Sequence, residues 1–458
     1  MQPPPDRLFK PFKRYPMADK KESKAQMAAA TQPTTANRTG SWRFEKPVFV
    51  EQIAPCREAC PVGEDIPTIM ALNDAGAFEE AYRRILLENP FPGICGKLCF
   101  HPCEKVCHRR HFDQAVSIRD LENYVSNTAR QSRLNIERPQ STRAPKAAVV
   151  GGGPAGLSTA YFLACLGYRV TILERNPHLV IYTQARKAPG ILLRHLQWEV
   201  GQILSLDIDH YLNVRLSRNY IQDFTAEFDV IYISARAKRT VQRLLKNATK
   251  DMQTDRVTLP TGAKRTQTVM LSRIRGTDAR VIYREPFSAA DATDPGKKDA
   301  DLSKYIVREI AAGKFAAMVI DISFQNAALD SVRQFTSGRL GALSMESYRQ
   351  RRRSNSSHRT EHVVRFSDLN TASFRKSDRI QPSQSDGLYS KQQAARSARR
   401  CFKCGICTFC KKCDDYCPDL SIYVDAKQKY REIDYDHCKG CGICAAECPR
   451  AAIDWVKE

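Results

Sequence analysis

The residues of this chain that could do chemistry are its seventeen cysteines, most of which form two sets at opposite ends of the sequence. The C-terminal set repeats the spacing C-x2-C-x2-C-x3-C-P, starting at Cys407 and again at Cys438. Thiolates at this spacing bind [4Fe–4S] clusters, and the fourth cysteine of each run ligates the other cluster. The expected ligands are Cys407, Cys410, Cys413 and Cys448 for one cluster, and Cys438, Cys441, Cys444 and Cys417 for the other. The sequence therefore predicts an electron-transfer protein.

Two other uses of these cysteines are disfavoured. A secreted disulfide framework needs an oxidising compartment, yet the cysteine count is odd and no charged and apolar leader opens the chain. Structural zinc prefers two C-x2-C pairs separated by a loop over three evenly spaced thiolates. Because oxidation destroys exposed thiolate clusters, we expect the protein in a reducing, low-oxygen cytoplasm.

The N-terminal cysteine set requires a wrapped backbone to bring its thiols together. Cys56 and Cys60 precede Pro61, and a later run places Cys95, Cys99, Cys103 and Cys107 at a spacing of x3. Apolar residues recur at helical spacing over 65–75, 78–88 and 117–129. The sequence therefore predicts a small helical domain around this cysteine set.

A glycine-rich turn lies between two predicted strands. Gly151, Gly153 and Gly156 form G-x-G-x-x-G after an apolar strand that starts at Lys146, and a second strand ends at Glu174. Such glycines let the backbone approach a pyrophosphate at a helix N-terminus, and the acidic residue can accept from ribose hydroxyls. The expected contacts to a dinucleotide are Gly151, Gly153, Pro154, Ala155, Gly156 and Glu174.

The length of 458 residues allows about three domains, and the motifs predict a multidomain α/β fold. We expect a disordered extension over 1–40, in which Met17 is an alternative start, and a helical iron–sulfur domain over 41–140. A degenerate FAD-type Rossmann-like domain over 141–343 and a basic linker over 344–398 follow. A bacterial-type 2[4Fe-4S] ferredoxin domain over 399–458 ends the chain. No run of about twenty apolar residues predicts a membrane span.

The formal net charge is +22, and much of it lies between Ser344 and Arg400. A nucleic-acid-binding patch is one interpretation of such charge. A solvated linker or a docking surface for an acidic partner is the other, and we favour it because no nucleic-acid-binding motif accompanies the charge. We therefore expect protein partners and no nucleic acid.

The segment from Asn89 to Cys107, with Pro61 upstream and Glu122 downstream, resembles a known domain. It is similar to the amino-terminal iron–sulfur domain of the glutamate synthase small subunit and of dihydropyrimidine dehydrogenase, over about residues 52–130. The resemblance implies that Cys95 packs without ligating. It also implies one cluster on Cys60, Cys99, Cys103 and Cys107.

The second cluster of that family would need an upstream C-x2-C pair, which this chain lacks. Residues 49–51 stand in its place, leaving only Cys56 and the candidate Glu122 as ligands. The C-terminal region carries one extra pair, Cys401 and Cys404. We hypothesise that this pair folds back to complete the cluster with Cys56 and Glu122; the alternative is that the pair is spare.

The run Gly151-Gly-Gly-Pro-Ala-Gly156 resembles the FAD site of the same family, which makes FAD a candidate cofactor. Leu179-Val180 replace a Gly-Gly pair of that family, Arg236 replaces a glycine, and Ala290-Asp291 replace Gly-Asp. A flavin-free scaffold is therefore the alternative. About fifty residues separate Arg236 from Pro286, too few for a second dinucleotide domain, so we do not expect NAD(P)H to bind.

The C-terminal stretch from Cys417 to Ile453, with residues 39–43, resembles the δ subunit of pyruvate and related 2-oxoacid:ferredoxin oxidoreductases. This implies an electron-transfer subunit of a larger complex, with four [4Fe–4S] clusters, a 2-oxoacid oxidoreductase as partner and a ferredoxin-like carrier as a candidate partner. No catalytic residue is predicted, because the chain would carry electrons and not bind the organic substrate. The alternatives are an NAD(P)H-dependent flavoprotein reductase and an assembly scaffold.

Overall fold

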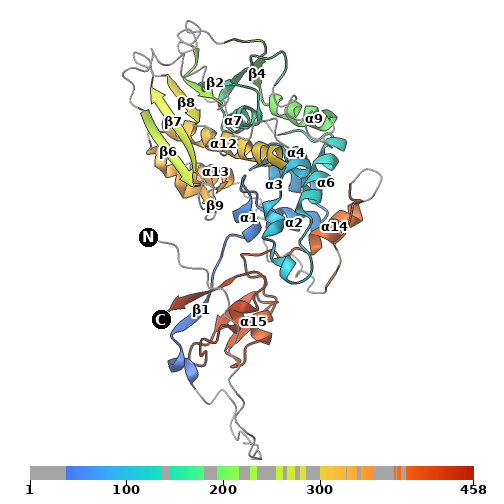
Figure 1. Cartoon of the computed structure of the whole chain (residues 1–458). Helices are drawn as coiled ribbons and strands as arrows, with labels where there is room; N and C mark the ends of the chain where they lie inside the picture. Colours follow the sequence, from blue (N-terminus) through green and yellow to red (C-terminus); the bar gives the residue numbers. More distant parts are fainter. Residues whose placement is uncertain are drawn as a thin grey trace, which may run out of the picture.

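The protein consists of three parts, which lie from top to bottom in Figure 1: a sheet-and-helix domain, a helical domain and a small C-terminal module. The predicted multidomain α/β fold class is confirmed. This computed structural model describes residues 38–136, 145–179, 193–215, 227–234, 254–260, 266–273, 279–284, 300–325, 327–337, 342–354, 376–377, 379–382 and 388–458. The predicted N-terminal extension up to residue 37, with Met17, lies outside these ranges, as do Val180, Arg236 and the pair Ala290-Asp291.

The helical domain contains the three helices predicted from apolar spacing, with ends that differ by at most two residues. Its helices are α1 (Pro55–Ala59), α2 (Ile66–Asp74), α3 (Phe78–Leu86), α4 (Pro92–Leu98), α5 (Pro102–Lys105) and α6 (Ile118–Gln131), with the 3-10 turn η3 (His108–His111) between the last two. Four of these helices begin with proline in the first turn, where its missing N–H costs nothing. Ile69, Ile85 and Leu121 belong to the core that the longer helices bury.

The sheet-and-helix domain has a seven-stranded sheet in the order β4-β3-β2-β5-β8-β7-β6. The parallel strands are β4 (Ile208–Tyr211), β3 (Arg169–Leu173), β2 (Lys146–Val150), β5 (Val230–Ile233) and β8 (Arg280–Arg284). Strands β7 (Thr266–Arg273) and β6 (Thr254–Pro260) continue the sheet antiparallel. The central strand β2 is buried at four of its five positions, as expected of a parallel strand covered on both faces.

Helices α7 (Pro154–Cys165), α9 (Leu193–Leu204) and α12 (Ala300–Phe324) pack with this sheet. Helix α12 crosses α7 at Gly313, where a Cβ atom would stand 2.4 Å from the carbonyl oxygen of Ala155. The hydroxyl of Ser158 donates to the carbonyl oxygen of Ile310 at 2.8 Å across the same contact. A side chain at 313 would therefore force the two helices apart.

The range 344–398, which we predicted to be a linker, contains two helices, and in this respect the prediction was wrong. Helix α13 (Met345–Ser354) follows the 3-10 turn η5 (Leu329–Phe335) and the short strands β9 (Thr336–Ser337) and β10 (Ala342–Leu343). Helix α14 (Lys391–Arg399) opens with a capping box between Ser390 and Gln393 and buries Ala394 and Ala398 against α2 and α6. Small buried residues within a polar, basic composition conceal this helix from a compositional prediction.

The C-terminal module includes the start of the described chain. Its elements are α15 (Lys412–Asp415), β11 (Ile422–Asp425), β12 (Tyr430–Ile433), α16 (Ile443–Ala446) and β13 (Ile453–Lys457). Strand β1 (Glu45–Phe49) pairs antiparallel with β13, with Pro47 opposite Trp455. Ahead of it the turn η2 (Thr39–Trp42) contacts the same module through Gly40, whose N–H donates to the carbonyl oxygen of Asp436 at 2.8 Å. Residues 39–49 thus pack with the module and not with the helical domain to which we had assigned them.

A buried carboxyl joins the sheet-and-helix domain to the helical domain. Glu199 on α9 is 1% exposed and accepts the N–H groups of Gly93 at 2.5 Å and Ile94 at 3.2 Å, at the start of α4. It also accepts the hydroxyl of Ser126 on α6 at 3.1 Å. Burial raises the pKa of Glu199 to about 7, against the lowering effect of these hydrogen bonds.

Stability should therefore fall with rising pH through this one group. The folded state holds the proton of Glu199 more tightly than the unfolded chain does. The protonated carboxyl therefore stabilises the fold fully below the unfolded pKa, and this stabilisation is lost as pH rises to about 7. The loss corresponds to about 3 kcal/mol. We expect Glu199→Gln to remove it, so that unfolding midpoints of the variant between pH 5 and 8 rise relative to wild type. Parallel pH profiles of the two proteins would contradict this.

Candidate iron–sulfur centres

The C-terminal module brings its eight cysteines of the two repeated runs into two groups. In the first, burial and the thiols of Cys410, Cys407 and Cys448 raise the pKa of Cys413 to about 12. The same four cysteines line one pocket. In the second, burial and the thiols of Cys438, Cys441 and Cys417 raise the pKa of Cys444 to about 11. The fourth cysteine of each run thus lies with the other run, which is the arrangement expected of crossed ligands.

Two short helices carry four of the cysteines of the helical domain. Helix α1 begins near Cys56 and ends just before Cys60, and helix α5 begins near Cys103 and ends before Cys107. The two helices pack together, with Cys56 beside Cys107 and Cys60 beside Cys103. They therefore run antiparallel and present one pair of thiols at each end. Four residues of helix rise by about 6 Å, so the two pairs are close neighbours.

The Cys60 end of this helix pair gathers three thiols and two carboxyls. Burial raises the pKa of Cys60, and the carboxyls of Glu64 and Glu122 raise it further. Burial raises the pKa of Cys99 and Cys103 as well, and Glu122 and the thiol of Cys60 raise it further. Burial also raises the pKa of both carboxyls, and the neighbouring charge of Glu64 raises that of Glu122 further. The donors available for a cluster here are Cys60, Cys99, Cys103 and Glu122. Cys95, buried in α4, lies beside them.

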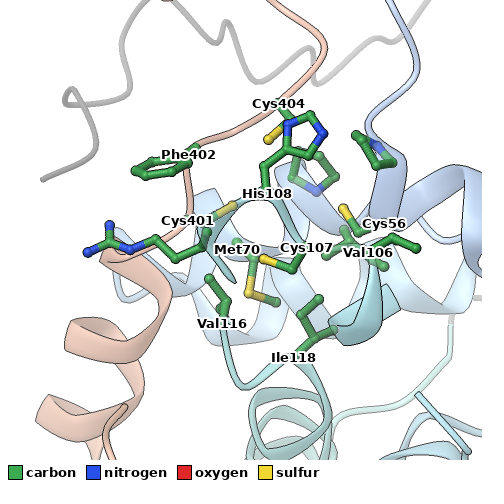
Figure 2. A pocket seen from close by; sticks show the side chains of 14 residues that line it. Cys56, Met70, Val106, Cys107, His108, Val116, Ile118, Cys401, Phe402 and Cys404 are labelled. Carbon is green, nitrogen blue, oxygen red and sulfur yellow. The ribbon is translucent and has the colours of Figure 1, made fainter. Parts of the chain in front are cut away.

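The Cys56 end gathers four thiols from both ends of the chain. Figure 2 shows Cys56, Cys107, Cys401 and Cys404 around one space in the pocket that they line. The pKa of Cys56 is raised by burial and then by the thiols of Cys401, Cys404 and Cys107. Burial raises the pKa of Cys401 to about 11, and the thiol of Cys107 contributes. The extra C-x2-C pair of the C-terminal region thus lies at the helical domain.

The structure partitions two of these residues differently from the sequence-based assignment. We had assigned Cys107 to the Cys60 group and Glu122 to the Cys56 group, whereas Cys107 lies with Cys56 and Glu122 lies with Cys60. The reason is the antiparallel pairing of α1 and α5, which sends the last cysteine of the later run to the end where α1 begins. Spacing within one run cannot reveal which end of a neighbouring helix it meets.

A buried cation anchors the segment that carries Cys401 and Cys404. Arg109, 1% exposed, pairs with Asp113 at 2.5 Å and donates to the carbonyl oxygen of Arg400 at 2.9 Å. Its guanidinium lies over the rings of Phe112 and Phe402, 5.2 and 4.9 Å from their centroids. These contacts bind the turn after α14 to η3, immediately beside Cys107. These contacts help to hold the segment in place beside the helical domain.

The donor sets suit a cluster better than a single ion. Within the described part of the chain, no three or more His, Cys, Asp or Glu side chains form a group that could hold one metal ion. A cubane is larger than an ion, so its ligands stand farther apart and surround it from several directions. Soft thiolates in buried groups of three or four are the donors that iron–sulfur clusters use. The arrangement can therefore hold clusters and pass single electrons between them.

Arg450 connects the two parts of this system. It is 1% exposed and lines the pocket of the Cys407 group. Its charge lowers the pKa of Cys404, opposing burial, and its carbonyl oxygen accepts the N–H of Gly405 at 2.6 Å. Sequence patterns do not single out this arginine, because it simply follows the last Cys-Pro pair. One buried positive charge thus lies between two candidate clusters.

The glycine turn of the dinucleotide fold is formed. Gly151 has φ +107°, and a Cβ on Gly156 would stand 1.8 Å from the carbonyl oxygen of Gly151, so both positions require glycine. Pro154 and Ala155 begin α7 behind the turn. This geometry suits a pyrophosphate at the N-terminus of α7.

The carboxylate of Glu174, which could accept from a ribose, is hydrogen-bonded to protein groups. Glu174 accepts the N–H of Gly152 at 2.7 Å and the side-chain amide of Asn176 at 2.7 Å. A ribose would share or replace these partners, since each carboxylate oxygen can accept two hydrogen bonds. Leu179 packs on Gly152, where a Cβ would stand 2.4 Å from the leucine methyl carbon. The residue that replaces a family glycine therefore narrows the approach to the turn.

Three segments of the chain match known families. Residues 51–134 match dihydropyrimidine dehydrogenase domain II, 4Fe-4S cluster; residues 149–205 match a NAD(P)-binding Rossmann-like domain; residues 431–454 match a 4Fe-4S binding domain. The first and third agree with the predicted [4Fe–4S] clusters. The second agrees with the predicted fold but runs against our expectation that NAD(P)H does not bind.

The chain is similar to subunits of several oxidoreductases. The NADPH-Fe(3+) oxidoreductase subunit beta of Geobacter sulfurreducens is 32% identical over 194 residues, 41% of this chain and 29% of that protein. The NADP(+)-dependent formate dehydrogenase subunit beta of Moorella thermoacetica is 29% identical over 208 residues, 40% of this chain and 29% of that protein. The NAD-dependent dihydropyrimidine dehydrogenase subunit PreT of Salmonella typhimurium is 34% identical over 150 residues, 31% of this chain and 32% of that protein. The chain thus spans less than a third of the length of these curated relatives.

Among solved structures, histamine dehydrogenase from Rhizobium sp. 4-9 aligns with 27% identity over 21% of this chain and 16% of that chain. The TM-score of 0.18 is too low to carry an argument about the fold. In the described residues, no helix is both long enough and apolar enough to cross a bilayer. The candidate site therefore rests on the cysteine geometry and the family matches.

Proposed function

We propose that this chain is an iron–sulfur electron-transfer subunit of a larger oxidoreductase in a reducing cytoplasm. It carries single electrons along a row of [4Fe–4S] clusters and leaves the organic substrate to another subunit. The observation that carries the proposal is the grouping of cysteines into sites that adjoin one another, from the C-terminal module into the helical domain. The similarity to oxidoreductase subunits supports it. The partner class that we favour is a 2-oxoacid oxidoreductase, on the resemblance of residues 417–453, with a ferredoxin-like carrier as a second partner.

Iron content of the anaerobically purified protein tests this proposal. Two clusters in the C-terminal module and one at Cys60 require about twelve iron atoms per chain, and each further cluster adds about four. On stepwise reduction, electron paramagnetic resonance should show interacting clusters in the module, because the crossed ligands hold the two clusters close together. Fewer than about eight iron atoms after reconstitution, or clusters that no low-potential donor reduces, would refute an electron-transfer role.

An NAD(P)H-dependent flavoprotein reductase is the second candidate function. The match of residues 149–205 to a NAD(P)-binding domain and the formed glycine turn favour it. In that case the domain would hold a dinucleotide, either FAD or NAD(P), against Gly151 and Gly156, with Glu174 toward the ribose. Flavin content distinguishes FAD from an empty turn. Bleaching of the cluster absorbance by NADPH alone would favour the reductase, whereas reduction only by a protein donor would favour the subunit role.

A further inference from the structure

We infer that Cys56, Cys107, Cys401 and Cys404 together bind one [4Fe–4S] cluster that links the C-terminal module to the helical domain. The inference rests on the proposed function, because it adds a fourth centre to the same electron path. Its ligands come from three segments that are far apart in the sequence. Only the folded chain assembles them.

The walls of this pocket suit a buried cluster. Apolar side chains surround the four thiols, among them Met70, Val116, Ile118 and Phe402 (Figure 2). Such a shell keeps water away from the cluster and lowers the local dielectric constant. The sulfur atom of Cys404 lies 3.7 Å from the carbonyl oxygen of Pro449, so the site also contacts the last Cys-Pro pair of the module.

The charges around the pocket compensate those of a bound cluster. Four thiols lose a proton each when they bind iron, so the complex of thiolates and cubane carries net negative charge. Arg109 lines the pocket, and the charges of Lys403 and Arg450 act on the thiol of Cys401. All three cations are about 1% exposed. Asp113 and Asp74 pair with Arg109 and Lys403 and offset part of their charge, and the remaining positive potential stabilises a buried anion.

The position of the site makes it the connecting centre. Cys404 precedes Cys407 of the first module cluster by three residues, and Cys56 precedes Cys60 of the helical-domain cluster by four. The backbones before Cys56 and after Cys404 meet at Gly405, whose carbonyl oxygen accepts the N–H of Gln52 at 2.8 Å. The approach is so close that a Cβ on Gly405 would stand 2.2 Å from the carbonyl oxygen of Gln52. A cluster here would therefore give electrons an intermediate site between the module clusters and the Cys60 cluster.

The double variant Cys401→Ser/Cys404→Ser tests the inference in the full chain, purified anaerobically and reconstituted with iron and sulfide. We expect wild type to hold about sixteen iron atoms and the variant about twelve, with loss of one component in the electron paramagnetic resonance spectrum. Cys107→Ser should remove the same component, and Cys60→Ser a different one. Cys165→Ser, in α7 away from every cysteine group, is the matched control and should keep all the iron.

The outcomes separate this inference from the proposed function. About twelve iron atoms in both wild type and the double variant would overturn the fourth site and leave the electron-transfer role standing. An unchanged spectrum in Cys107→Ser would overturn the ligand set. If the double variant does not fold, as judged by circular dichroism and gel filtration, the single variant Cys404→Ser decides. Its retention of the spectral component in full would overturn the inference.

Discussion

Replacing Lys314 by methionine should destabilise the folded chain by about 3–5 kcal/mol, because it leaves an uncompensated buried carboxylate. Lys314 on α12 is 1% exposed, and its ammonium pairs with Glu88 at 2.6 Å. The same ammonium donates to the carbonyl oxygen of Val62, two residues after Cys60, and lies 5.8 Å from the ring centroid of Phe162. Anaerobic urea titration of the full chain measures the effect. We also expect easier loss of iron from the Cys60 centre.

A double variant isolates the cause. Glu88 additionally accepts the N–H groups of Met345 at 2.8 Å and Glu346 at 3.1 Å, so it must keep an acceptor. Glutamine at this position retains one carbonyl oxygen and removes the charge. Lys314→Met/Glu88→Gln should therefore recover part of the lost stability. Lys427→Met, at an exposed turn, should change stability by less than about 0.5 kcal/mol. If Lys314→Met behaves like Lys427→Met, the ion pair does not hold the two domains together.

Replacing Arg450 by methionine should lower the midpoint potentials of the two proposed clusters beside it, those of Cys413 and Cys404. Removal of a buried positive charge disfavours the reduced cluster, which is the more negative state. A unit charge about 6–8 Å away, at an effective dielectric constant of about 20, is worth about 2–3 kcal/mol. For one electron this corresponds to roughly 90–130 mV. A redox titration followed by electron paramagnetic resonance measures the shift.

The charge explanation has its own control. Arg450→Lys keeps the positive charge and should preserve most of both potentials, whereas Arg396→Met removes an exposed charge on α14 and should leave them unchanged. The clusters of Cys60 and Cys444 should shift less than the two that flank Arg450. Equal shifts in Arg450→Lys and Arg450→Met would show that the side chain acts through its shape and not through its charge.

Local sequence was enough to predict several parts of the molecule. The apolar spacing over 78–88 predicts α3 because one face of that helix is buried, and G-x-G-x-x-G predicts the turn because only glycine fits at Gly156. The repeated C-x2-C runs predict cluster ligands because three thiols within one short loop already surround a centre. In each case the information lies within about thirty residues. Helix α14 escaped prediction because its buried face consists of two alanines and a serine in a basic segment.

The sequence left open whether the two ends of the chain combine, and the tertiary structure decided it. The pairing of β1 with β13 and the packing of α14 on the helical domain bring Cys401 and Cys404 to Cys56 across more than three hundred residues. The antiparallel contact of α1 with α5 places Cys107 there and leaves Glu122 with Cys60. Thiol spacing determines which residues can bind iron. Helix direction and domain packing determine which of them share a cluster.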